Sequence, residues 1–234
     1  MGKVAFIFSG QGAQYVGMGK DLYDNFATAR KVFENADNSL KDSISTLCFD
    51  GPMDKLSETE NTQPAIVTHS LACFNVLREE GICPDIVAGL SLGEYSALAA
   101  AESIPYEQVT SLVKKRGKFM QEAVPLGKGT MAAILGLDRD SVLTICDMAS
   151  DKGVVEAANF NCPGQVVIAG EVEAVNKAVD LAKQKGAKRA MILSVSAPFH
   201  CSLLKPAADN LAKELADIEI KDNKIPVVSN VNAD

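Results

Sequence analysis

The segment GLSLG, residues 89–93, combines residue types and spacing that could do chemistry. It matches Gly-x-Ser-x-Gly, in which two glycines permit a sharp turn and present the serine hydroxyl at the start of a helix. The apolar run PDIVA before it predicts a buried strand, and the alanine-rich stretch after it predicts a helix. Amide groups and the dipole at a helix N-terminus favour a developing oxyanion. We therefore interpret Ser91 as a candidate nucleophile.

A nucleophilic serine needs a general base, and the sequence contains two histidines. His69 lies on the apolar side of a helix predicted from Pro64 to Gly81, where a packed core histidine is the common case. His200 lies in the loop SAPFHC ahead of another predicted helix, where a side chain can face a cleft. We predict His200 as the base, and spacing assigns no acid as a third member of a triad.

Two other segments could contribute to such a site. The loop SGQGAQ, residues 9–14, follows the first predicted strand and fits neither a dinucleotide-binding motif nor a P-loop. A loop in this place is either an ordinary turn or the source of a backbone N–H for an oxyanion. Arg116 lies in a predicted helix before a glycine, and it is either a solvated side chain or a bidentate partner for a carboxylate. Spacing leaves both pairs of alternatives open.

The elements that must position these residues alternate between strands and helices. Residues 3–8 and 84–89 predict buried strands, and helices are predicted at 64–81 and directly after Ser91. This alternation is typical of an α/β layer with a parallel sheet. A final strand is predicted within KIPVVSNV, residues 224–231. The fold class is therefore α/β, with a hydrolase-like large domain around a central parallel sheet.

From residue 127 onward the pattern changes. Strands and helices now follow the order β-α-β-β-α-β, which is the order of the ferredoxin-like unit. We predict an inserted ferredoxin-like subdomain at 127–193, inside a large α/β domain formed by 1–126 and 194–234. The subdomain is short enough to be an insertion in the larger domain.

Charge and composition argue against several classes of protein. The formal net charge of −7 disfavours nucleic-acid binding, and no run approaches the roughly 20 apolar residues of a membrane span. The six cysteines form no C-x-x-C pair, so no metal site is expected, and the N-terminus lacks a signal peptide. We expect a cytoplasmic protein. Two basic stretches, 114–118 and 183–189, are candidate surfaces for an acidic partner, and the alternative for each is a solvated helix end.

Motifs along essentially the whole chain resemble those of the malonyl-CoA:acyl-carrier-protein transacylases of bacterial type II fatty-acid synthesis. They are FIFSGQGAQYVGMGKDLY, TQPAIVTHSLA, GLSLGEYSALAAA, RGKFMQEAVP, NFNCPGQVVIAG and VSAPFHCSLLKPAADNLAKEL. The resemblance implies a ping-pong transfer of the malonyl group from malonyl-CoA, through a malonyl-serine ester, to the phosphopantetheine thiol of acyl carrier protein. It implies no cofactor beyond these substrates. The family runs on past residue 234, so the resemblance also implies that the C-terminal part of the large domain is missing.

The resemblance assigns roles to residues within the matching motifs. Ser91 would be the nucleophile with His200 as its base, and the backbone N–H groups of Gln11 and Leu92 would form the oxyanion hole. Arg116 would hold the free carboxylate of malonate. The histidine of this family is oriented by a main-chain carbonyl, in keeping with the absence of an assignable acid.

The partners expected from the resemblance are acyl carrier protein and coenzyme A, without nucleic acid or membrane, and with the enzyme as a monomer. We place the carrier-docking surface on Lys185, Lys188 and Arg189. Two other functions are open at this point. One is an α/β-hydrolase-like serine esterase or thioesterase, and the other is an inactive carrier-docking fragment.

Overall fold

The computed structural model describes residues 2–193, 195 and 197–234, and the chain forms two compact units. The first comprises Met1–Lys118 with Lys213–Asp234, and the second comprises Phe119–Ala212. The domain boundaries predicted from the order of strands and helices lie between 126 and 127 and between 193 and 194. The two compact units instead meet between 118 and 119 and between 212 and 213. The boundaries expected from the sequence stay a prediction, and residues 194 and 196 lie outside the described part of the chain.

The first unit is built on a parallel sheet in the order β1-β2-β7. These strands are β1 (Ala5–Phe8), β2 (Ile86–Gly89) and β7 (Val227–Val228). The central strand β2 buries Val87 completely and ends at Gly89, directly before the candidate nucleophile. The predicted α/β class with a parallel sheet is confirmed. The last strand is shorter than predicted, because only two of its residues pair with β2.

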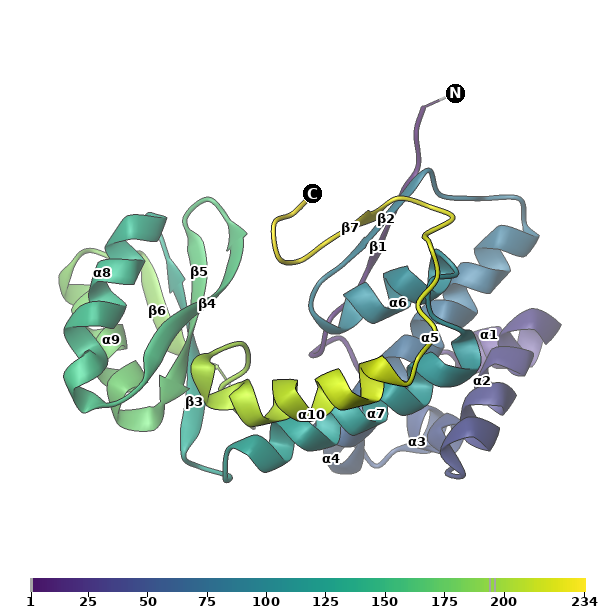
Figure 1. Ribbon diagram of the computed structural model, residues 1–234, viewed down its shortest axis with the longest axis horizontal. Coiled ribbons are helices and arrows are strands. Elements are labelled where there is room, and N and C mark those ends of the chain that lie inside the picture. Colours follow the sequence, from purple (N-terminus) through teal and green to yellow (C-terminus); the bar gives the residue numbers. More distant parts are fainter. Residues whose placement is uncertain (1, 194, 196) are drawn as a thin grey trace. The chain divides into compact units, whose positions relative to one another are not determined.

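Helices cover this sheet (Figure 1). The helices that begin in this unit before residue 119 are α1 (Lys20–Asn25), α2 (Ala27–Leu40), α3 (Ile44–Asp50), α4 (Met53–Leu56), α5 (Thr59–Glu79), α6 (Leu92–Ala100) and α7 (Tyr106–Ala123), and the last turn of α7 belongs to the second unit. Phe8, Phe74 and Ala97 bring β1, α5 and α6 into one apolar cluster. α5 and α6 thus pack against the strands that precede the candidate nucleophile and the loop after β1.

The predicted start of α5 at Pro64 is wrong. The helix begins at Thr59, and Pro64 lies inside it. A proline within a helix lacks one N–H donor and is usually unfavourable. Here Thr62, Gln63 and Pro64 are all buried, and the Thr62 hydroxyl donates to the Leu56 carbonyl at 2.5 Å. Tertiary packing at the start of α5 therefore overrides the local start signal at Pro64.

The second unit contains an antiparallel sheet in the order β4-β5-β3-β6. Its elements are, in chain order, β3 (Gly129–Leu135), α8 (Arg139–Ala149), a 3₁₀ turn (Ser150–Lys152), β4 (Val155–Cys162), β5 (Gln165–Glu171), α9 (Val172–Gln184), β6 (Arg189–Ile192), a second 3₁₀ turn (Ser202–Leu204) and α10 (Lys205–Ala216), which ends in the first unit. The order from β3 to β6 is the predicted β-α-β-β-α-β.

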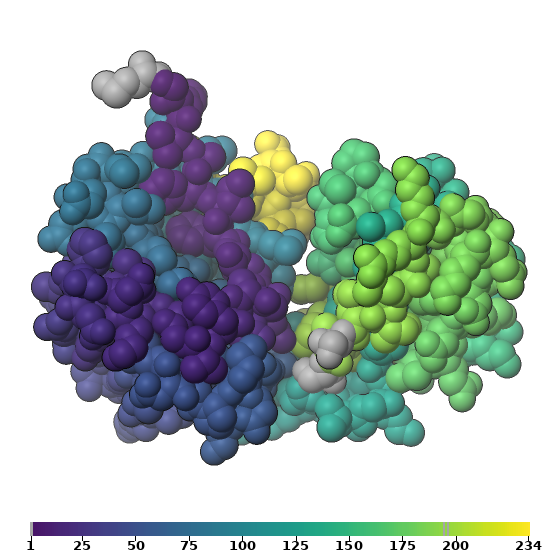
Figure 2. Space-filling model, turned by 180° about the vertical axis from the view of Figure 1, so that it is seen from behind, coloured from purple at the N-terminus to yellow at the C-terminus, as the bar shows by residue number. Residues whose placement is uncertain are grey.

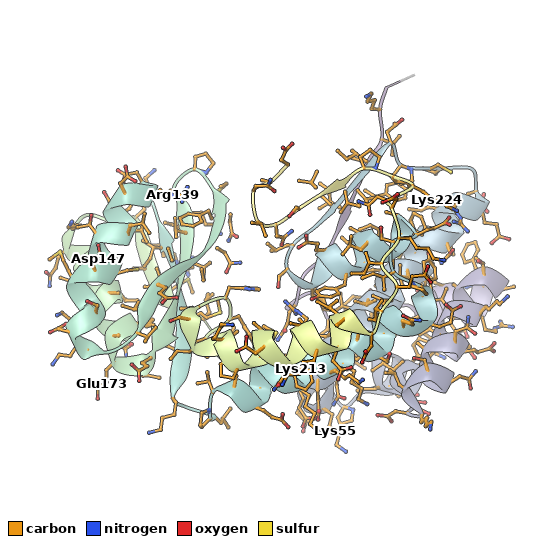
Figure 3. All side chains as sticks on the ribbon, viewed as in Figure 1. Lys55, Arg139, Asp147, Glu173, Lys213 and Lys224 are labelled. Carbon is orange, nitrogen blue, oxygen red and sulfur yellow. The ribbon has the colours of Figure 1, made fainter. Side chains whose placement is uncertain are left out.

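The two faces of this sheet bury different side chains, as the two-residue period of a strand requires. Ile134 and Ile168 pack with α8 and α9 on one face, where the two helices lie side by side (Figure 1). The charged side chains of Asp147 and Glu173 point away from it (Figure 3). Met131 belongs to a second apolar cluster, together with residues of the segment around His200: Ala197, Phe199, Cys201 and Leu204.

The six cysteines are all free. Burial raises the pKa of Cys48 to about 12 and that of Cys146 to about 11, so both thiols are protonated and pack as small apolar side chains. In the part of the chain that the structure describes, no helix combines the length and the apolar character that crossing a bilayer requires.

Candidate active site

Ser91 occupies a sharp turn between β2 and α6. Its backbone has φ 52° and ψ −97°, an uncommon conformation for a residue with a side chain. Leu92 is the first residue of α6, so its N–H has no acceptor inside the helix. A strained serine at this kind of turn is typical of a nucleophile elbow. The structure therefore gives Ser91 the local geometry predicted for it.

The two glycines of the motif are required by close packing. A Cβ on Gly89 would lie 2.0 Å from the backbone carbon of Gly93, and a Cβ on Gly93 would lie 2.2 Å from the Phe8 carbonyl oxygen. Both distances are far below van der Waals contact. The absence of side chains at 89 and 93 thus allows α6 to approach β1 and β2 closely enough to form the elbow.

We expect Gly93→Ala to destabilise the first unit, because the added methyl group meets backbone that cannot move independently. Overpacking of this kind costs about 2 kcal/mol or more. The midpoint of urea unfolding measures the effect. Gly2→Ala is the control, since nothing lies within 4 Å of a Cβ at Gly2. An unchanged midpoint for Gly93→Ala would contradict the close approach of α6 to β1.

Arg116 of α7 lies next to the candidate nucleophile Ser91. Its Nη1 donates to Gln63 Oε1 at 2.8 Å, and its Nη2 donates to Ser91 Oγ at 3.1 Å. The guanidinium also lies over the Tyr95 ring, 5.3 Å from the centroid. Arg116 is only 8% exposed. Of the two alternatives that spacing left open, the solvated side chain is therefore excluded.

The charge of Arg116 is not neutralised by a bound carboxylate. Within residues 2–193, 195 and 197–234, no acidic side chain forms a salt bridge with it. Burial lowers the pKa of Arg116, and Tyr95 and Glu94 act in the opposite direction. Arginine nevertheless stays protonated in proteins. A buried cation without a counter-ion is costly, so this position favours an anionic ligand.

Gln63 is a site residue that spacing did not identify. It is completely buried in the first turns of α5. Gly117 lets α7 approach that turn, since a Cβ there would lie 2.5 Å from the Thr59 carbonyl oxygen. This close contact places the neighbouring Arg116 against Gln63. The only signal for Gln63 in the sequence is its place in the motif TQPA.

The loop after β1 borders the elbow. A Cβ on Gly10 would lie 2.8 Å from the Leu90 carbonyl oxygen, and Gln11 Nε2 lies 3.5 Å from Thr59 Oγ1. The loop is therefore close enough to the elbow for the predicted backbone donor. The roles of the Gln11 and Leu92 amides stay predictions.

Asn230, which follows β7, was also not identified by spacing. Its Oδ1 accepts from the Ser91 N–H at 2.6 Å, and its Nδ2 donates to the Gly89 carbonyl oxygen at 2.6 Å. Its own backbone N–H donates to Glu94 Oε1 at 3.3 Å. Asn230 thus contacts the elbow on both sides of Leu90.

His200 lies in the second unit and has a positive φ of 65°. The residues after it are anchored: the Ser202 N–H and hydroxyl both donate to the Glu156 carboxylate, at 2.7 and 2.6 Å. The Cys201 thiol donates to the Pro198 carbonyl at 3.2 Å. The His200 side chain itself is exposed. Its role as the base for Ser91 stays a prediction.

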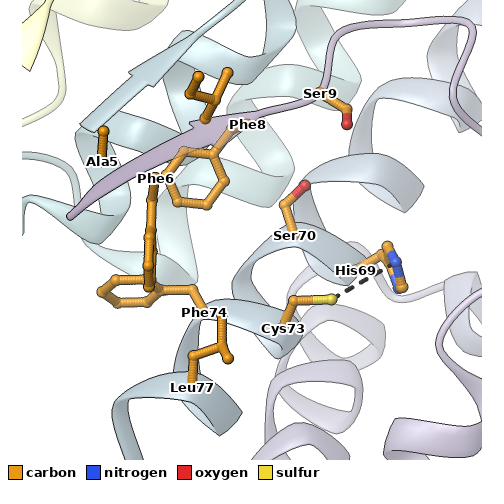
Figure 4. Close-up of a pocket in the computed structure, with 10 residues that line it drawn as sticks. Ala5, Phe6, Phe8, Ser9, His69, Ser70, Cys73, Phe74 and Leu77 are labelled. Carbon is orange, nitrogen blue, oxygen red and sulfur yellow. Dashed lines mark hydrogen bonds between the residues drawn. The ribbon is translucent and has the colours of Figure 1, made fainter. Parts of the chain in front are cut away.

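His69 belongs to a different part of the first unit (Figure 4). It lines a pocket of about 320 Å³ between β1 and α5, together with Cys73 and Phe74, and its Nε2 lies 3.7 Å from Cys73 Sγ. Burial lowers the pKa of His69. No residue of the described chain hydrogen-bonds its Nδ1. The elbow residue Ser91 is not part of this lining, so His69 packs away from the candidate nucleophile.

Both basic stretches contain lysines that pair with acidic side chains. Lys114 pairs with Asp42 at 2.9 Å and Lys115 pairs with Glu214 at 2.5 Å. The second stretch contains the predicted docking residues, and all three are exposed: Lys185, Lys188 and Arg189. Figure 2 shows this part of the chain, in light green, at the surface of the second unit. Lys183 of the same stretch pairs with Asp180 at 3.5 Å, so the docking role of the other three residues stays a prediction.

Comparison with known proteins relates the chain to acyl-transferring enzymes. A family model described as the acyl transferase domain matches residues 5–234. The malonyl CoA-acyl carrier protein transacylase of Bacillus subtilis (strain 168) is 49% identical over 235 residues, covering 100% of this chain and 74% of that protein. The protein of the same name from Staphylococcus aureus (strain MRSA252) is 47% identical over 234 residues, covering 100% of this chain and 75% of its own length.

Solved structures give the same result. The acyl-carrier-protein S-malonyltransferase of Burkholderia pseudomallei 1710b superposes with a TM-score of 0.95 at 50% identity, covering 100% of this chain and 76% of that one. A malonyl-transacylase solved in complex with a type II polyketide synthase acyl-carrier protein superposes with a TM-score of 0.96 at 46% identity, with the same coverage.

Proposed function

The chain belongs to the acyl transferase domain family, and we propose that it transfers a malonyl group from malonyl-CoA to the phosphopantetheine thiol of an acyl carrier protein. The names of the relatives support this activity, and the relative solved with a carrier protein supports the partner. Fatty-acid synthesis, in a cytoplasmic setting, is the process that this transfer would serve. The enzyme would act as a monomer.

The observation that carries this proposal is the buried guanidinium of Arg116 beside Ser91, which forms no salt bridge with any residue that the structure describes. A malonyl group on Ser91 Oγ has its carboxylate carbon two atoms beyond the acyl carbon, and Arg116 Nη2 lies 3.1 Å from Ser91 Oγ. A guanidinium binds a carboxylate through two parallel hydrogen bonds. A site for neutral acyl groups gains nothing from a buried cation in this position.

The reaction would proceed in two half-reactions. In the first, Ser91 Oγ attacks the thioester carbonyl while His200 accepts the hydroxyl proton, and the backbone N–H groups of Gln11 and Leu92 stabilise the oxyanion. The carbon–sulfur bond then breaks, and the CoA thiolate takes the proton from His200. In the second, the carrier thiol gives its proton to His200 and attacks the malonyl-Ser91 ester; the ester C–O bond breaks, and Ser91 Oγ takes the proton back from His200. Malonyl-CoA supplies an activated thioester, so no cofactor is needed.

The finer description of the fold also belongs to this proposal. We describe the first unit as the hydrolase-like large domain, supported by the elbow between β2 and α6. The segment from β3 to β6 is described as a ferredoxin-like subdomain, supported by its order of elements and by the strand order β4-β5-β3-β6. The exposed Lys185, Lys188 and Arg189 would dock the acidic carrier.

Transfer is tested by incubating the chain with malonyl-CoA and a phosphopantetheinylated acyl carrier protein, and then measuring the mass of the carrier. We expect malonylated carrier and free CoA in equal amounts. Acetyl-CoA serves as the control donor and should be used far less well. Release of free malonate without malonylated carrier would instead favour a serine esterase or thioesterase. Absence of both products would favour an inactive carrier-docking fragment.

A further inference from the structure

The short strand β7 stops pairing with β2 just before the nucleophile elbow. Val227 is opposite Val87 and Val228 is opposite Ala88 in this parallel pair. Continuing the register by two residues places Asn230 opposite Leu90. The last backbone-paired residues are therefore Val228 and Ala88. They lie two positions before Leu90, where a longer β7 would hydrogen-bond to the backbone on both sides of the turn.

The side chain of Asn230 takes over that support. In a parallel ladder, the residue opposite position 90 would donate to the carbonyl of 89 and accept from the N–H of 91. The Asn230 amide does both, with Nδ2 donating to the Gly89 carbonyl and Oδ1 accepting from the Ser91 N–H, each at 2.6 Å. A side-chain amide thus replaces one peptide group of the missing strand.

This arrangement bears directly on the conformation of Ser91. Its φ of 52° and ψ of −97° are unfavourable for a residue with a Cβ, and such a conformation persists only where its surroundings hold it. The two hydrogen bonds of Asn230 fix the backbone on both sides of Leu90. The Ser91 N–H donates to Asn230 Oδ1 and is therefore not available to an oxyanion. The next backbone N–H along the chain, that of Leu92, would then be the donor at this end of α6.

The loop that presents Asn230 is itself held in place. The Ala233 N–H donates to the Ser229 carbonyl at 2.9 Å, the Ser229 N–H donates to an Asp234 oxygen at 3.0 Å, and the Asn230 N–H donates to Glu94 Oε1. The asparagine is therefore presented by a folded turn, and its amide lies against the elbow.

We propose that Asn230 is a positioning residue for the nucleophile: its side-chain amide continues the β2–β7 ladder and holds Ser91 in the conformation required for acylation. This inference rests on the proposed function, in which Ser91 is acylated. Asparagine is suited to the role because one short side chain carries both a donor and an acceptor. Alanine removes both groups, and aspartate keeps an acceptor for Ser91 while losing the donor for Gly89.

The first measurement is hydrogen exchange of the Ser91 amide by NMR, which does not depend on activity. We expect the exchange to be at least about tenfold faster in Asn230→Ala than in the wild type, because the amide loses its acceptor. Asn230→Asp should stay closer to the wild type. Asn232→Ala, the same change in an exposed residue of the same turn, is the matched control and should have no effect. Unchanged protection in Asn230→Ala would overturn the proposal.

The second measurement is the single-turnover rate of Ser91 acylation by malonyl-CoA, followed by intact mass. We expect Asn230→Ala to react about 10- to 100-fold more slowly, with unchanged affinity for malonyl-CoA, because misplacement of a reacting group lowers the rate rather than binding. Asn230→Asp should show a smaller defect and Asn232→Ala none. The proposal would be overturned if folded Asn230→Ala were acylated at the wild-type rate, because Asn230 would then have a purely structural role.

A fluorophosphonate separates this proposal from the proposed function, because it phosphonylates an activated serine without requiring a malonyl donor. In that reaction Ser91 Oγ displaces fluoride from phosphorus and loses its proton to the base. If the wild type reacts with the probe but not with malonyl-CoA, the proposed function fails, and the probe rates of the Asn230 variants decide the role of Asn230. A wild-type chain that reacts with neither reagent would overturn both.

Discussion

Replacement of Ser91 by alanine is expected to abolish both the malonyl-protein adduct and the transfer to the carrier. The hydroxyl is the atom that would form the ester, and no other group replaces it at the start of α6. Loss of the nucleophile of an acyl-transfer site lowers the rate on the order of 10⁴-fold or more. Intact mass spectrometry after mixing with malonyl-CoA measures the adduct, and a coupled carrier assay measures the transfer.

Ser96→Ala is the matched control for this experiment. Ser96 is in the same helix and completely buried, and its hydroxyl has no hydrogen-bond partner in the described chain. Its replacement should leave the adduct and the transfer unchanged. Persistence of the adduct in Ser91→Ala would show that another residue carries the malonyl group, and the proposed mechanism would be wrong.

Replacement of Arg116 by alanine should have the second largest effect, and the effect should depend on the charge of the acyl group. Two charge-assisted hydrogen bonds to the malonyl carboxylate are lost, each worth about 1.5–3 kcal/mol. We therefore expect kcat/KM for malonyl-CoA to fall by about 10²- to 10⁴-fold. The rate with acetyl-CoA, whose acyl group has no carboxylate, should change much less. The ratio of the two kcat/KM values is the measurement.

Two further variants give this test its controls. Arg116→Lys keeps the charge but loses the planar fork, so it should recover only part of the malonyl preference. Arg78→Ala removes a half-exposed arginine that pairs with Glu102, and the preference should be unaffected. Thermal unfolding must accompany the assay, because Gln63 loses a buried partner in Arg116→Ala. An equal loss for malonyl-CoA and acetyl-CoA would contradict the assigned role.

The elbow could be predicted from the sequence because all of its parts are local. The strand that ends at Gly89, the turn at Ser91 and the helix that begins at Leu92 follow one another directly. The glycines needed for close packing are part of the same five residues. The order of strands and helices, and hence the α/β class, follows in the same way from hydrophobic periodicity and from glycine and proline signals.

The surroundings of Ser91 were decided only by the tertiary structure. Arg116 is 25 residues from Ser91 and 53 from Gln63, and Asn230 is 139 residues from Ser91. Hydrogen bonds between side chains or turns so far apart leave no periodic pattern along the chain. Packing likewise extended α5 through Pro64, against the local signal. The sequence by itself thus determined the elbow with its candidate nucleophile, its strand and its helix, because these depend on neighbouring residues. The partners that bury a charge beside Ser91 and brace its backbone depend on contacts that exist only once the chain is folded.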